Sequence, residues 1–60
     1  MLENWTGDVV GIMHVNKISH QQLAEKLGWH VKYLSAVLNG KRNPKKAEEK
    51  IREALKELIE

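Results

Sequence analysis

The sequence predicts an all-α domain, a small bundle of four helices with a five-helix bundle as the alternative. Apolar residues recur at three- and four-residue spacing along most of the 60-residue chain. No segment alternates apolar and polar residues as a half-buried strand would. Residues that begin or stop helices flank the periodic segments. Because so short a chain has room for one small core, we expect a single domain over residues 1–60.

The first helix is expected over about residues 7–15. Thr6 is a suitable N-cap residue, because its hydroxyl can accept a hydrogen bond from a free backbone N–H of the first turn. Val9, Ile12 and Met13 then share one face of the helix. This face should be buried in the core.

The second helix has the clearest boundaries. Ser19 and Gln22 form a capping box, in which each side chain satisfies the backbone N–H of the other residue. Gly28 should end the helix, since glycine readily adopts the left-handed backbone of a helix stop. The expected buried stripe comprises Leu23, Ala24 and Leu27.

The third helix is expected from about Val31 to Asn39, with His30 as a poor N-cap. Its inward residues are Leu34, Val37 and Leu38.

The fourth helix is expected to begin beside Asn43, a suitable N-cap, with Pro44 at the first helical position. Glu48 and Arg52 can pair on its outer face, because residues four apart are neighbours on a helix surface. The apolar residues at helical spacing are Ile51, Ala54, Leu55, Leu58 and Ile59.

The net charge of +2 conceals an uneven distribution along the chain. Six lysine and arginine residues and one glutamate lie between residues 20 and 46, a net charge of +5, whereas the remainder carries four cations and seven anions, a net charge of −3. This asymmetry favours a partner that is a polyanion. The alternative is a solvated surface that happens to be uneven.

Residues 20–39 fit a helix-turn-helix motif. Two helices are separated by a short turn with Gly28 at the bend, and the small residue Ala24 stands where the helices must cross closely. This combination predicts double-stranded DNA as the partner, although a plain helical hairpin also uses glycine and leucine.

The segment from Lys17 to Pro44 resembles the helix-turn-helix of the phage-repressor type, the Cro/C1 or Xre-like regulators. The matching residues are Gln22, Leu23, Ala24, Leu27, Gly28, Tyr33, Leu34, Ser35, Leu38, Asn39 and Gly40. The resemblance implies a lambda-repressor-like bundle, a second motif helix that lies in the DNA major groove, and dimers that bind two half-sites.

The outward side of the third helix supplies the expected base contacts. Helical angles turn Lys32 and Ala36 away from the core, Ser35 lies on the flank, and the resemblance adds Val31. A lysine here suits guanine O6 and N7, although it could also be a plain surface lysine. The expected phosphate contacts are His20, Gln21, His30, Tyr33, Asn39, Gly40, Lys41 and Arg42.

The function expected from these features is sequence-specific binding of double-stranded DNA by a small, cytoplasmic transcriptional regulator or repressor of phage or mobile-element type. A homodimer is expected at least on DNA, with Ile59 and Ala54 at the edge of the last helix as candidate contacts. The alternative is a protein-interaction module, an antitoxin or adaptor, that retains the fold.

Enzyme activity, cofactors, metals and membranes are not expected. The sequence offers no nucleophile–base pair and no phosphate-binding loop, and it contains no cysteine. The three histidines have no helical i, i+4 spacing that would suit a metal. No apolar run approaches the length of about 20 residues that a membrane-spanning helix requires.

Overall fold

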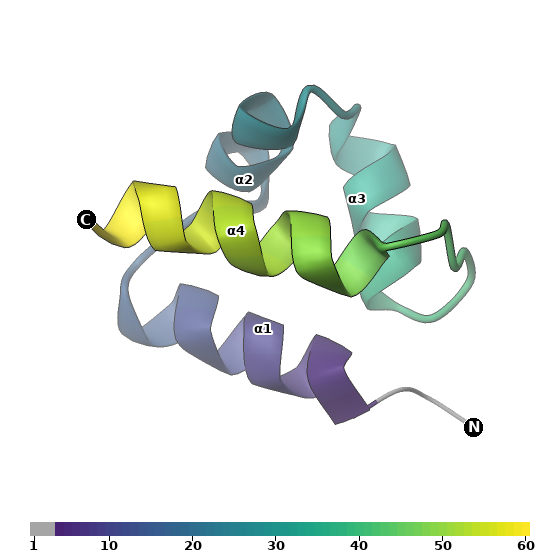
Figure 1. Cartoon of the computed structure of the whole chain (residues 1–60), viewed down its shortest axis with the longest axis horizontal. Coiled ribbons are helices and arrows are strands. Elements are labelled where there is room, and N and C mark those ends of the chain that lie inside the picture. The colour runs from purple at the N-terminus through teal and green to yellow at the C-terminus, as the bar shows by residue number, and fades with distance from the viewer. Residues whose placement is uncertain (1–3) are drawn as a thin grey trace.

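The computed structural model describes residues 4–60, and this part of the chain consists of helices and loops without any strand. The helices are α1 (Asn4–Val15), α2 (His20–Leu27), α3 (Val31–Leu38) and α4 (Ala47–Ile59). Helices α1 and α4 lie side by side, and α2 and α3 lie on the far side of α4 in the view of Figure 1. The prediction of an all-α bundle of four helices is confirmed over this range.

One apolar core lies where the four helices meet. Each helix contributes a side chain with no exposed surface, Val9, Leu23, Leu34 and Ile51 respectively. Burial of one such side chain stabilises the fold by about 1.5–3 kcal/mol, so these contacts dominate the packing. The inward faces predicted for α2 and α3 are confirmed, with Leu27 only partly buried. Ala54 is also in the core, so the prediction that it lies at an exposed edge is wrong.

Helix α1 begins at Asn4, earlier than the sequence predicted. Thr6 lies inside the helix and is buried, so its prediction as the N-cap is wrong. The reason is the position of Thr6 three residues before Val9, which places both side chains on the inward face. Extending the helix by one turn also packs Trp5 against the core.

Helix α4 begins at Ala47, later than predicted. Pro44 starts a turn instead of the helix, and its carbonyl accepts a hydrogen bond from the N–H of Ala47 at 3.2 Å. Lys46 has a left-handed backbone with φ 59°, which interrupts any helix from Pro44 onward. The roles predicted for Asn43 and Pro44 are therefore wrong. This turn places Ala47, only 3% exposed, in the core.

The first three helices end in the same hydrogen-bonded turn. At the end of α1, the N–H of Ile18 donates to the carbonyl of Met13 at 2.8 Å. Equivalent bonds follow α2 and α3, where Gly28 and Gly40 adopt left-handed φ values of 76° and 78°. Lys17 occupies the corresponding position after α1 with φ 56°. This backbone costs a residue with a side chain about 1 kcal/mol relative to glycine.

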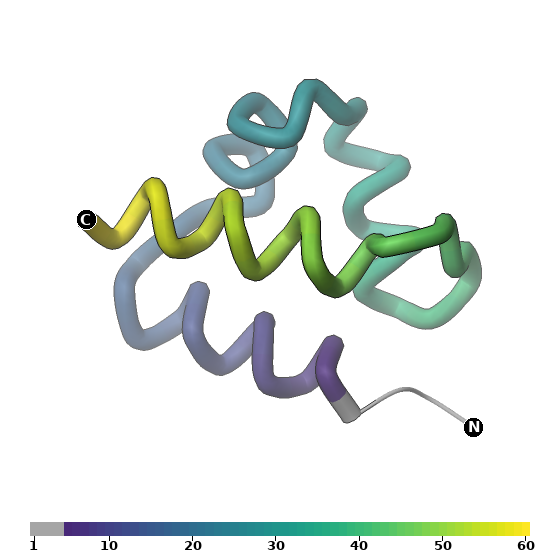
Figure 2. Tube along the Cα trace, viewed as in Figure 1, coloured from purple at the N-terminus to yellow at the C-terminus, as the bar shows by residue number. Residues whose placement is uncertain are grey.

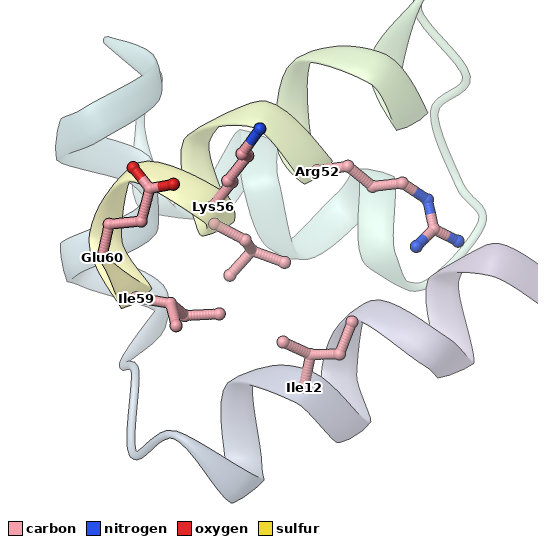
Figure 3. A pocket seen from close by; sticks show the side chains of 6 residues that line it. Ile12, Arg52, Lys56, Ile59 and Glu60 are labelled. Atoms are coloured by element: carbon pink, nitrogen blue, oxygen red, sulfur yellow. The ribbon is translucent and has the colours of Figure 1, made fainter.

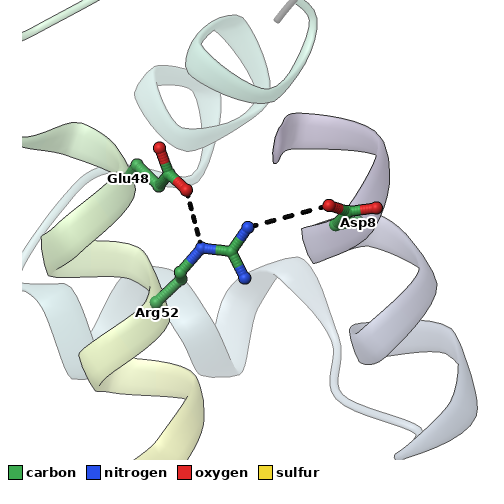
Figure 4. Close-up of polar contacts among 3 residues, drawn as sticks. All are labelled: Asp8, Glu48 and Arg52. Atoms are coloured by element: carbon green, nitrogen blue, oxygen red, sulfur yellow. Dashed lines mark hydrogen bonds and ion pairs between the residues drawn. The ribbon is translucent and has the colours of Figure 1, made fainter. Parts of the chain in front are cut away.

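Surface ion pairs join the helices at the edges of the core. Arg52 Nε lies 2.8 Å from Glu48 Oε2, which confirms the predicted pair, and Arg52 Nη2 lies 3.8 Å from Asp8 Oδ2 on α1 (Figure 4). Lys26 and Glu57 connect α2 to α4 at 2.8 Å. Because these groups are largely exposed, each pair contributes less than about 1 kcal/mol.

None of the helices within residues 4–60 combines the length and the apolar character needed to cross a membrane. The path of the chain in Figure 2 shows that the loop between α3 and α4 lies at the end of the bundle opposite the C-terminus.

The substitution Lys17→Gly is expected to stabilise the protein by about 0.5–1 kcal/mol, because it relieves the left-handed backbone at that position. Urea unfolding monitored by circular dichroism measures the difference. Lys17→Ala is the matched control, since it removes the charged side chain but keeps the Cβ atom, and it should give no gain. Equal stabilisation by both variants would contradict the backbone explanation.

Candidate nucleic-acid interface

The start of α2 is held by the predicted capping box. The N–H of Ser19 donates to Gln22 Oε1 at 2.9 Å, and the N–H of Gln22 donates to Ser19 Oγ at 3.1 Å. The helix runs for eight residues and ends at Gly28, whose N–H donates to the carbonyl of Glu25 at 3.2 Å. Both predicted boundaries of the helix are confirmed. The helix is therefore fixed at both ends, and only residues 28–30 separate it from α3.

His30 is the N-cap of α3, as predicted. The N–H of Lys32 donates to His30 Nδ1 at 3.1 Å. This bond requires a lone pair on Nδ1, so in the neutral ring the proton is on Nε2. The exposed imidazole consequently offers Nε2–H as a donor for an external acceptor such as a phosphate oxygen. The capping role and the predicted phosphate contact are compatible in one side chain.

The outer face of α3 carries the predicted base-contact residues. Lys32 is exposed on the side opposite Leu34 and Val37, which lie in the core. Val31, which the resemblance placed among the base contacts, is 38% exposed. Ser35 is partly buried on the flank of the helix. These side chains lie on one short helix whose first turns are open to solvent.

The loop after α3 folds back over the end of that helix. The N–H groups of Lys41 and Arg42 both donate to the carbonyl of Ala36, at 2.8 and 3.3 Å. This reversal partly covers Ala36, although helical angles point it outward. It also borders a shallow hollow of about 600 Å³ that is open to solvent. The hollow is lined by Tyr33, Ala36, Lys41, Arg42, Asn43 and Pro44.

Sequence reasoning missed the contacts within this hollow. The guanidinium carbon of Arg42 lies 5.8 Å from the centre of the Tyr33 ring. The Trp29 ring meets Tyr33 in a T-shaped contact, with ring centres 5.0 Å apart. Asn43 and Pro44 also line the hollow but were assigned only to the start of a helix. No local pattern signals the contact between Arg42 and Tyr33, because the chain reversal at Gly40 creates it, whereas the four-residue spacing of Trp29 and Tyr33 could have indicated their contact.

The remaining predicted phosphate contacts occupy two places. Asn39 and Gly40 are exposed at the end of α3, beside the basic loop. His20 and Gln21 are exposed in the first turn of α2, a separate element. Backbone N–H groups at a helix N-terminus favour anions, which suits a phosphate there. The contacts of all these residues with DNA stay predictions.

The substitution His30→Ala is expected to destabilise the protein by about 1 kcal/mol, because it removes the acceptor for the N–H of Lys32. His30→Asp is the matched control and should retain the stability, since a carboxylate also caps a helix. Thermal unfolding of the two variants measures the difference. Equal stability of His30→Ala and the unchanged chain would show that the cap contributes nothing.

Comparison with models of protein families matches residues 16–48 to the family described as helix-turn-helix. The match covers more than half of the chain, from the end of α1 to the start of α4. No curated protein and no solved structure matches the chain. The motif predicted at residues 20–39 lies wholly within the matched segment, and the structure forms it from α2, the turn at Gly28 and α3. The chain belongs to the helix-turn-helix family of DNA-binding proteins.

Proposed function

We propose that this chain is a small transcriptional regulator, a repressor of phage or mobile-element type, that binds specific sequences of double-stranded DNA in the cytoplasm. The observation that carries the proposal is the outer face of α3. Lys32 is exposed there beside a basic loop that contains Lys41 and Arg42. A cationic helix face within a helix-turn-helix domain matches the polyanionic major groove.

In this proposal α3 lies in the major groove and its first turns meet the base edges. The ammonium group of Lys32 contacts guanine O6 and N7, and the hydroxyl of Ser35 donates or accepts a hydrogen bond. Val31 and Ala36 provide apolar contact with a thymine methyl group. Ala36 is partly covered by the following loop, so its contact is shallower than that of Lys32.

Phosphate contacts fix the orientation of the domain without reading sequence. Lys41 and Arg42 supply them at the end of α3, and His20 and Gln21 supply them at the start of α2. In the sequence, one pair of residues precedes α3 and the other pair follows it. This arrangement supports a backbone contact on either side of the base-reading helix.

A second copy of the chain completes the proposed function, because one motif reads too few base pairs for high specificity. An apolar groove of about 290 Å³ lies between α1 and α4, and Figure 3 shows Ile12 and Ile59 facing each other across it. Ile59 is 48% exposed. Arg52, Lys56 and Glu60 give the rim of the groove mixed charge. The groove supports a weak contact between two copies on adjacent half-sites.

Binding to a duplex of random sequence should weaken steeply with salt. Lys41 and Arg42, the two cationic phosphate contacts, predict a slope near −1.8 in log affinity against log salt for each bound copy, or about a tenfold loss between 50 and 200 mM. Fluorescence anisotropy with labelled DNA measures this slope. Binding that is insensitive to salt, or no binding to any duplex, would instead favour the protein-interaction module.

Lys32→Ala is expected to relax base preference at one position of each half-site by about 1–3 kcal/mol, because one base-edge contact is lost. Selection of bound sequences from a random duplex pool, done with both chains, measures the preference. Lys50→Ala on α4 is the matched control, since this exposed lysine lies outside the proposed interface. An unchanged sequence preference in the Lys32→Ala variant would contradict base reading by this residue.

A further inference from the structure

The guanidinium of Arg42 lies over the ring of Tyr33, and this ring makes a further aromatic contact of its own. We infer that Tyr33 is a positioning residue, whose ring holds the guanidinium of Arg42 ready for a DNA phosphate. This inference rests on the proposed function and gives Tyr33 a different role from the phosphate contact expected from the sequence. It concerns the ring of Tyr33 and not its hydroxyl group.

The ring of Tyr33 contacts a residue of the turn between α2 and α3. Trp29 contacts it edge-on, with an interplanar angle of 84° and ring centres 5.0 Å apart. The backbone N–H of Trp29 donates to the carbonyl of Ala24 at 2.9 Å, which anchors the backbone of this residue to the end of α2. Both aromatic residues are partly buried against the core. These contacts therefore define the position and the orientation of the Tyr33 ring.

Both the backbone and the guanidinium group of Arg42 make contacts within the protein. Its backbone N–H donates to the carbonyl of Ala36 at 3.3 Å, and its guanidinium carbon lies 5.8 Å from the centre of the Tyr33 ring. A free arginine side chain loses rotamer freedom when it binds a ligand. Here part of that freedom is already lost in the unbound protein, so less remains to be lost on DNA.

The guanidinium keeps its donors for an external anion. A cation–π contact with the face of a ring uses none of the five N–H donors of the guanidinium, so they stay available for hydrogen bonds. Among residues 4–60 no carboxylate lies within ion-pair distance of Arg42. A phosphate oxygen at the mouth of the hollow can therefore accept these bonds. A lysine at this position would keep the charge but not the planar fork of donors that matches a phosphate.

The test is a double-mutant cycle on affinity for one labelled random duplex, measured at several salt concentrations. Arg42→Gln should reduce affinity about tenfold and lower the salt slope by about one unit, as expected for one lost phosphate contact. Tyr33→Leu should reduce affinity about two- to fivefold, the equivalent of an exposed cation–π contact. In the Arg42→Gln background, Tyr33→Leu should have almost no further effect.

Two conservative variants separate the possible roles of the side chains. Tyr33→Phe keeps the ring and should keep the affinity, whereas a hydroxyl contact with phosphate would make it as damaging as Tyr33→Leu and would overturn the inference. Arg42→Lys lies in an exposed loop and keeps the charge, so it tests the planar guanidinium separately from the charge. It should keep the salt slope but reduce affinity, because the planar fork of donors is lost.

Lys41 provides the matched control cycle, because it neighbours Arg42 but makes no contact with a ring. Lys41→Gln and Tyr33→Leu should reduce the affinity independently, so that their effects multiply. Independent effects of Arg42→Gln and Tyr33→Leu would overturn the inference while leaving the proposed function intact. If the unchanged chain binds no duplex at any salt concentration, the proposed function fails and the inference fails with it.

Discussion

The left-handed turn at Gly28 determines where the surface of this protein can meet a partner. Its φ of 76° and the two hydrogen bonds that close α2 let the chain change direction within residues 28–30. The following helix then brings Leu34 into the core with Leu23 of α2 and Ile51 of α4. Because an α-helix buries only one face in such a contact, the opposite side of α3 must face solvent. The exposure of Lys32 is thus a consequence of core packing.

A second turn of the same kind, at Gly40, gives the uneven charge of the sequence its place in space. The hydrogen bonds from the loop to the carbonyl of Ala36 fold residues 41 and 42 back beside α3. Cations that are distant from Lys32 along the chain consequently lie at the other end of the same helix. The loop then continues to Lys46, whose own left-handed backbone directs Ala47 into the core. Core packing and charge placement in this domain therefore depend on the same few turns.

The features that could be predicted from the sequence depend on short-range interactions. The Ser19–Gln22 capping box, the stop at Gly28 and the inward faces of α2 and α3 each follow from residues within one or two turns. The start of α1 was predicted wrongly because Thr6 suits two positions. A threonine can cap a helix, and it can also lie buried inside a helix when its hydroxyl is hydrogen-bonded. The start of α4 was predicted wrongly because the left-handed Lys46 depends on the fit of Ala47 to the other helices. The contact between Arg42 and Tyr33 needs a chain reversal that local patterns do not encode.

The central claim is that the surface formed by α3 and its following loop, and not the α1–α4 side, meets duplex DNA. Titration of the isotope-labelled protein with a duplex, followed by NMR chemical shifts of the backbone amides, tests it directly. We expect the largest shifts within residues 30–42, smaller ones at the start of α2 and in the groove between Ile12 and Ile59 where two copies meet, and little change on the rest of α1 and α4. Shifts concentrated on α1 and α4 in the presence of DNA, with α3 unaffected, would contradict the claim.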